Sequence, residues 1–214
     1  MAVIHHTTLV PSKLELLAGW LPAQPWYADP EREPSLANVG GFRLDDPEGE
    51  VGIEFMVVAD GTATYLVPMT YRGAPREGDG LIGTTEHGVL GRRWVYDGTH
   101  DPVLVTQLVA LIQGGAQPQA QHTTDTPDPA VVGYPLTDGA LAVRGFTVAA
   151  SHPEVTEIRV DADGSPFTIL VHRRMRVDEA APSAGVTGAW RLPDGTTARG
   201  TFATVIPVGS TAGA

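Results

Sequence analysis

Cysteine is absent from the 214 residues, which excludes disulfides, thiolate nucleophiles and cysteine-ligated metal sites. Lysine occurs once, at Lys13, against 13 arginines, and this removes most candidates for a catalytic or phosphate-gripping lysine. No stretch approaches the roughly 18 apolar residues of a membrane span, and residues 1–9 lack the basic and apolar parts of a signal peptide. We therefore expect a cytoplasmic protein.

Charge narrows the range of partners. The net charge is -11 and the isoelectric point is near 4.9. This negative field repels phosphate backbones and anionic lipid, so neither nucleic acid nor a membrane surface is an expected partner. About 42% of the residues are hydrophobic, and 25 Gly and 18 Pro supply frequent turns. The length suits one large or two small domains, and the composition favours a sheet-rich fold over a helical bundle.

Two short helices are predicted in the first half. Ser12 and Glu15 form a capping box that begins the first helix. Asp101, with Pro102 at the first helical position, begins the second helix, and Gly114-Gly115 ends it.

Alternating apolar residues predict antiparallel strands, and Asp-Gly pairs predict tight turns between them. The expected strands cover 3–9, 51–59, 62–72, 92–96, 141–149, 155–161, 166–177, 187–192 and 197–205. Asp-Gly turns are expected at 60–61, 163–164 and 194–195, and Pro68 places part of its strand at an edge or bulge. Residues 22–38 are expected to form a loop.

Motifs for cofactors or metals are weak. The G-x-G-x-x-G pattern at 78–83 lacks the preceding strand that a phosphate-binding loop requires, and Asp79 would oppose an anion, so we interpret it as an ordinary loop. Residues 161–164 begin like a calcium loop but lack its later acidic ligands, which favours a tight turn. The histidines are scattered, and neither H-E-x-x-H nor G-x-S-x-G occurs. We expect no cofactor and no metal.

Acidic and aromatic residues gather in the first half. Carboxylates between 45 and 54 could in principle do acid–base work on glycosides, but solvated loop charge explains most of them. Glu54, inside an apolar strand, would be of interest only if buried. The aromatic side chains could stack on sugar rings or anchor a partner, although core packing is their ordinary role.

Several ordered strings resemble maltokinases. Residues 20–27, WLPAQPWY, resemble the W-L-P-x-Q-R-W-F stretch near the start of that family, with Pro25 where the family usually carries Arg. Residues 67–72 with 81–84, and 94–98 leading into His100-Asp101-Pro102, resemble the family's N-terminal cap sheet. The resemblance covers roughly 10–113. It implies a curved, cystatin-like antiparallel sheet with helices packed on it.

The second half resembles the β-rich part of a kinase N-lobe more loosely. Residues 167–175, FTILVHRRM, resemble the family strand L-I-L-K-L-F-R-R-L, and Leu170 stands at its ATP-contacting lysine. Asn38 is the only asparagine, and the 39 residues after Met175 do not suggest the helical lobe that carries the catalytic and metal-binding residues. We therefore predict that the protein is not an enzyme.

Together these features predict an α+β, antiparallel-sheet-rich protein. We assign a maltokinase-type cap domain to 1–116, a linker to 117–130, a β-rich domain resembling a degenerate kinase N-lobe to 131–206 and a flexible tail to 207–214. The predicted function is a non-catalytic accessory or interaction protein of α-glucan, maltose or trehalose metabolism, partnered by an enzyme of that pathway or by a second copy. The alternative is a binding module for maltooligosaccharide. The candidate contact residues are Trp20, Trp26, Tyr27, Tyr71, Arg72, Trp94, Asp97 and His100.

Overall fold

The computed structural model describes residues 9–121, 123, 125–163, 165–178 and 180–207. Its first half contains β1 (Leu9–Val10), α1 (Lys13–Trp20), the 3-10 turn η1 (Leu21–Ala23), β2 (Leu36–Leu44), β3 (Gly52–Asp60), β4 (Ala63–Arg72), β5 (Leu81–His87), β6 (Gly91–Asp97), the 3-10 turn η2 (Gly98–His100) and α2 (Pro102–Ile112). The second half contains β7 (Gln119–Ala120), β8 (Val132–Tyr134), β9 (Val143–Ser151), β10 (Val155–Ala162), β11 (Phe167–His172), β12 (Gly185–Arg191) and β13 (Thr197–Pro207).

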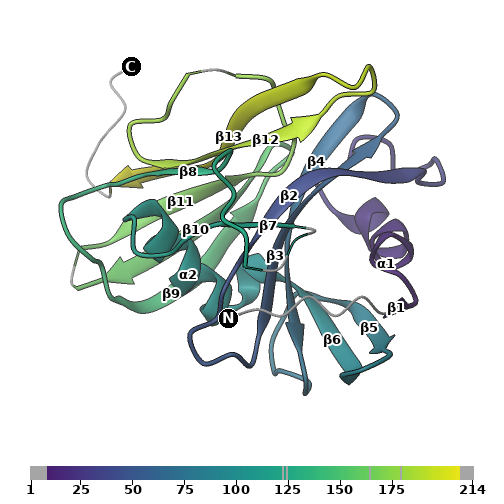
Figure 1. The fold of residues 1–214 in the computed structure, drawn as a ribbon, viewed down its shortest axis with the longest axis horizontal. Coiled ribbons are helices and arrows are strands. Elements are labelled where there is room, and N and C mark those ends of the chain that lie inside the picture. The colour runs from purple at the N-terminus through teal and green to yellow at the C-terminus, as the bar shows by residue number, and fades with distance from the viewer. Residues whose placement is uncertain (1–8, 122, 124, 164, 179, 208–214) are drawn as a thin grey trace.

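All strands belong to one hydrogen-bonded sheet, drawn in Figure 1. The order is β1-β5-β6-β4-β3-β2-β12-β13-β11-β10-β9, with β7 on β2 and β8 on β12. Neighbouring strands run antiparallel, which confirms the predicted sheet-rich α+β class with two short helices. The two halves meet where Trp190 of β12 pairs with Gly40 of β2. The division into domains at 117–130 stays a prediction.

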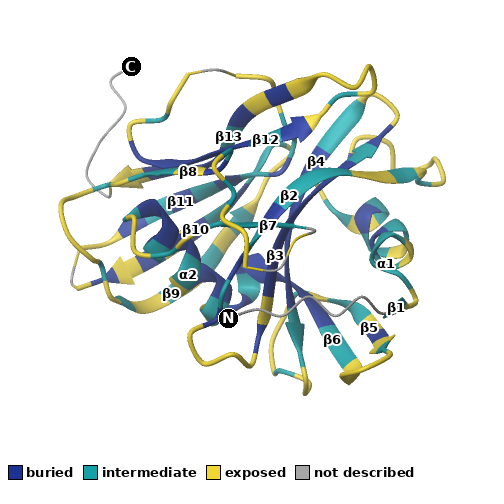
Figure 2. Cartoon of the chain, in the orientation of Figure 1, coloured by how far each residue is buried: buried dark blue, intermediate teal, exposed yellow. Residues whose placement is uncertain are grey.

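Two hydrophobic clusters lie on opposite faces of β3. Ile53, Phe55 and Val57 face a core that also contains α2 and strands of the second half. Met56 and Val58 face a smaller cluster with α1 and Trp26. The run of buried residues along the central strands is visible in Figure 2. β3 is thus covered on both sides, and the predicted alternation fixes which residues go to which cluster.

Local signals in the sequence place the helices and hairpins correctly. The Ser12–Glu15 capping box is present, and the Asp101 side chain accepts a hydrogen bond from the Val103 amide at the start of α2. Gly61 and Gly195 adopt the positive φ that their turns require. Pro68 interrupts no ladder because β4 bonds to β6 only from Met69 onward.

Other expectations need correction. β2 was not predicted, and its first residues fall in the expected loop 22–38, because Asn38, Gly40 and Gly41 obscure its alternation. β5 begins at Leu81, inside the G-x-G-x-x-G pattern at 78–83, so only the first half of the pattern is the expected loop. A strand stands where a phosphate-binding motif would place a helix. β7 lies within the expected linker. β11 ends at His172, short of the predicted 177.

Some expectations fall outside the described residues. Of the expected strand 3–9, only Leu9 is described, within β1, and Gly164 and the tail 208–214 are not described. Among the described residues, α2 is the longer of the two helices at 11 residues, and neither is long and apolar enough to cross a membrane.

Candidate functional site

Arg173 lies at the junction of the two halves with its side chain 1% exposed. Its Nη2 is 2.5 Å from Asp97 Oδ2 and 3.0 Å from Thr99 Oγ1, and its Nε donates to Thr156 Oγ1 at 2.8 Å. The guanidinium carbon is 4.9 Å from the Trp26 ring centroid. We call Arg173, Asp97, Thr99, Thr156 and Trp26 the Arg173 cluster. A buried cation is tolerated here because it has an acid, two hydroxyls and an aromatic face.

The backbone around Arg173 extends this junction. Leu66 N–H donates to the Arg173 carbonyl at 2.9 Å, and Met175 N–H donates to the Thr64 carbonyl at 2.8 Å. Arg174 Nε donates to the Trp26 carbonyl at 2.8 Å. Residues 173–175 therefore continue beyond the end of β11 and run along residues 64–66 of β4, which do not pair with β6. The second half is in this way hydrogen-bonded directly to the first.

Glu54 is buried, at 2% exposure, which was the condition for its being of interest. It accepts hydrogen bonds from Lys13 Nζ and Tyr71 Oη, both at 2.6 Å, and from Gln121 Nε2 at 2.8 Å. Burial raises the pKa of Glu54, but the Lys13 charge and the three donors outweigh it, so the pKa lies below its usual value. Burial and the Glu54 charge raise the pKa of Tyr71 well above its usual value. Glu54 is thus an ionised, fully bonded group.

Asp101 and Arg72 form a second paired site. Arg72 donates two hydrogen bonds of 2.7 Å to the Asp101 carboxylate, and Thr70 Oγ1 donates a third at 2.8 Å. Burial raises the pKa of Asp101, but Arg72, Thr70 and the Val103 amide more than offset it and lower the pKa overall. Asp101 therefore holds the start of α2 against β4.

Asp60 and Asp46 complete the set of buried acids near the expected site. Asp60 accepts a short hydrogen bond from Tyr27 Oη. Its Oδ1 also forms an ion pair with Arg32 Nη2 at 2.6 Å. Burial raises the pKa of Tyr27, and the Asp60 carboxylate raises it further. Asp46 accepts from three backbone amides in its own turn. These carboxylates are committed to structural bonds, which disfavours the paired acid and base that glycoside hydrolysis needs.

The predicted contact residues divide by burial. Trp26, Tyr27 and Asp97 lie inside the protein, so they cannot serve as surface contacts and instead bond other parts of the chain. Trp20 is half-buried, with its ring 5.7 Å from that of Trp26. The other four are also half-buried: Tyr71, Arg72, Trp94 and His100. Of these, Tyr71 and Arg72 are bonded to the buried acids described above.

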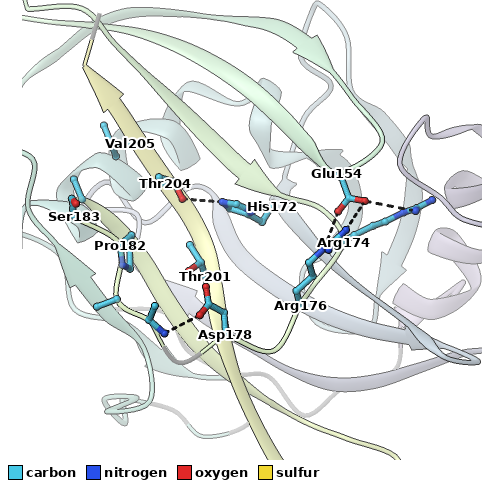
Figure 3. A pocket seen from close by; sticks show the side chains of 13 residues that line it. Glu154, His172, Arg174, Arg176, Asp178, Pro182, Ser183, Thr201, Thr204 and Val205 are labelled. Carbon is cyan, nitrogen blue, oxygen red and sulfur yellow. Dashed lines mark hydrogen bonds and ion pairs between the residues drawn. The ribbon is translucent and has the colours of Figure 1, made fainter. Parts of the chain in front are cut away.

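A hollow of about 460 Å³ with a mixed polar and apolar lining opens on the second half, far from those residues in the sequence. Figure 3 shows side chains from β11, β13, Glu154 and the segments 174–178 and 180–184 around it. We call it the His172 pocket; its polar lining residues are Glu154, His172, Arg174, Arg176, Asp178, Ser183, Thr201 and Thr204. No local pattern in the sequence predicts this pocket, because its residues come from separate strands and loops.

Within the pocket, Glu154 is paired with two arginines, and Asp178 accepts a hydrogen bond from the Ala180 amide. Glu154 lies 3.2 Å from Arg176 and 3.9 Å from Arg174. His172 Nε2 is 2.9 Å from Thr204 Oγ1. Burial lowers the pKa of His172, while Glu154 opposes this shift, so the ring is neutral near pH 7. Across the described residues, no three His, Cys, Asp or Glu side chains are grouped to hold a metal ion.

The fold and its buried ion pairs define a sheet-rich α+β protein whose first half is bonded to its second through the Arg173 cluster. Residues 20–101 match the family of the maltokinase N-terminal cap domain, which confirms the resemblance found in the sequence over that segment. The match runs from Trp20 to Asp101 and includes every predicted contact residue. Comparisons with curated proteins and with solved structures found no match.

Proposed function

We propose that this chain is a non-catalytic accessory or interaction protein linked to maltose or trehalose metabolism. The observation that carries the proposal is the match of residues 20–101 to a maltokinase cap domain, combined with Leu170 at the position of the ATP-contacting lysine. Leu170 pairs with Glu157 and Thr204 inside the sheet. A leucine cannot supply the charge that holds nucleotide phosphates.

The arrangement of the second half supports the same proposal. β9 to β13 form an antiparallel unit, and we propose that it is a degenerate kinase N-lobe, with a cystatin-like cap sheet beside it. Residues 185–207 add β12 and β13 to the sheet and contribute no helix to a catalytic lobe. The Arg173 cluster fixes this unit to the cap. The cap is therefore presented as a rigid surface, which suits a role in positioning a partner enzyme in the cytoplasm.

Native mass measurement tests the partner role. The full chain is measured alone and mixed with a maltokinase, and a complex or a dimer of the chain is the expected result. Trp94 is half-buried and lies in the segment that matches the cap family, so Trp94→Ala should weaken the complex. Arg159→Ala, at an exposed residue of β10 outside that segment, is the control and should leave the complex unchanged. A chain that remains monomeric and binds neither maltokinase nor other enzymes of maltose or trehalose metabolism contradicts the proposal.

ATP turnover tests the absence of catalysis. We expect ADP formation at the background rate with maltose or trehalose present, because Leu170 replaces the lysine. Turnover above the rate of a heat-denatured control would refute this part of the proposal. The alternative, binding of maltooligosaccharide at the tryptophans, has only Trp20 and Trp94 left for stacking because Trp26 is fully buried.

A further inference from the structure

The His172 pocket lies in the second half, outside the segment that matches the cap family. Its floor is formed by His172 of β11 and by Thr201 and Thr204 of β13 (Figure 3). Each of these three residues is half-buried and has a strand neighbour in the larger core, namely Val171, Phe202 and Ala203. Thr201 and Thr204 share a face although they are three positions apart, because the pairing of β12 with β13 is irregular between Val186 and Thr187. Segments 174–178 and 180–184 form the wall. The pocket is therefore built from strands and one covering segment.

The charges that line this pocket sum to zero. Arg174 and Arg176 are balanced by Glu154 and Asp178, and His172 and Thr204 form a neutral hydrogen-bonded pair. A phosphate or carboxylate ligand would approach two carboxylates, and a cation would approach two guanidinium groups. For each class the repulsion offsets the attraction to the oppositely charged pair, so neither gains a net electrostatic advantage. The lining favours an uncharged ligand.

The polar groups suit a ligand with many hydroxyls. Carboxylates accept hydrogen bonds, guanidinium groups donate them, and Ser183, Thr201 and Thr204 hydroxyls do both. Small apolar side chains, including Pro182, lie among these groups and offer contact to C–H surfaces. A volume of about 460 Å³ lies within the range of small-molecule sites. Donors, acceptors and apolar patches therefore alternate over a space that can hold one or two sugar rings.

We propose that the His172 pocket binds an uncharged polyhydroxylated molecule of mono- or disaccharide size. Glu154 and Asp178 accept hydrogen bonds from its hydroxyls, Arg176 donates hydrogen bonds at the rim, and Thr204 bonds to it beside His172. The site is independent of the cap and of the tryptophans, so it goes beyond the proposed partner role. Loss of partner binding would leave it intact.

Calorimetric titration of the full chain with maltose, trehalose and inorganic phosphate tests this site. We expect saturable binding of at least one sugar and no binding of phosphate. Thr204→Val, which keeps the side-chain shape, should weaken sugar binding about tenfold, as expected for a lost hydrogen bond. Thr168→Val is the matched control: Thr168 lies on the same face of β11 but outside the pocket, and its variant should bind as the wild type does.

Three outcomes would overturn the assignment. The first is no saturable response to either sugar at concentrations up to about 50 mM. The second is binding of phosphate, with its loss in Arg176→Gln, because that indicates an anion site. The third is sugar binding that survives Thr204→Val and Asp178→Asn but is lost in Trp94→Ala, which places the sugar on the cap. Thermal melts of each variant exclude unfolding as the cause.

Discussion

Replacing Arg173 by Met should destabilise the whole protein. The change keeps most of the apolar stem but leaves Asp97 as a buried carboxylate without its cation, and it removes the contact with the Trp26 ring. Removing one partner of a buried ion pair costs about 3 to 5 kcal/mol. For a chain of this length, each kcal/mol lowers the melting temperature by about 2 to 4 °C. We therefore expect a fall of about 6 to 20 °C, measured by circular dichroism on heating.

A double-mutant cycle separates the ion pair from general damage. Asp97→Asn alone should also destabilise the protein, and the double variant should lose less than the sum of the two single variants by about 0.5 to 3 kcal/mol. Arg159→Met is the matched control, because Arg159 is exposed on the neighbouring strand and its loss should change stability by no more than about 0.5 kcal/mol. Strict additivity, or an Arg173→Met variant within about 1 kcal/mol of wild type, would refute the reasoning.

Two further variants address the paired acids. The pKa of Glu54 is lower in the folded protein than in the unfolded chain, where it is about 4.3. Ionised Glu54 therefore stabilises the fold at pH values above the unfolded pKa, and that stabilisation is lost as pH falls through the folded pKa. The stability gap between wild type and Glu54→Gln, from urea unfolding, should therefore narrow as pH drops from 6 to about 3. A pH-independent gap, or the same trend in the exposed Glu50→Gln, would contradict this. Asp101→Ala removes the cap of α2 and the hydrogen bonds to Arg72 and Thr70. Urea unfolding should therefore show a free energy of unfolding lower by about 3 kcal/mol. An effect as small as that of the control Asp79→Ala, at an exposed residue, would count against this prediction.

Sequence reasoning succeeded where the structural cause is local. Ser12 and Glu15 lie within one turn of each other, and Asp101 caps a helix that starts at the next residue, so a short window contains the whole signal. The Asp194-Gly195 turn is of the same kind, with the Asp194 side chain bonded to Thr196. The cap family was also found from short strings, and the match over 20–101 confirms it.

The remaining features depend on contacts between distant residues. β2 has no clean alternation, and its place in the sheet comes from pairing with β3 over most of its length. In the sequence Arg173 is only one letter of the string 167–175, and its partner Asp97 lies 76 positions away. The composition of a strand does not reveal which distant acid it will meet. For the same reason Trp26 and Asp97 were assigned to a surface, although the first-half cluster around Trp26 and the side chain of Arg173 enclose them.

The path of residues 173–175 along β4 affects how the cap should be studied. A fragment limited to residues 20–101 would uncover the Trp26 carbonyl and the backbone of Thr64 and Leu66, which the intact chain satisfies with its own Arg173, Arg174 and Met175. Exposed strand edges of this kind recruit other strands. Self-association or captured proteins seen with such a fragment would report an artificial edge, and only the full chain presents the native surface of the cap.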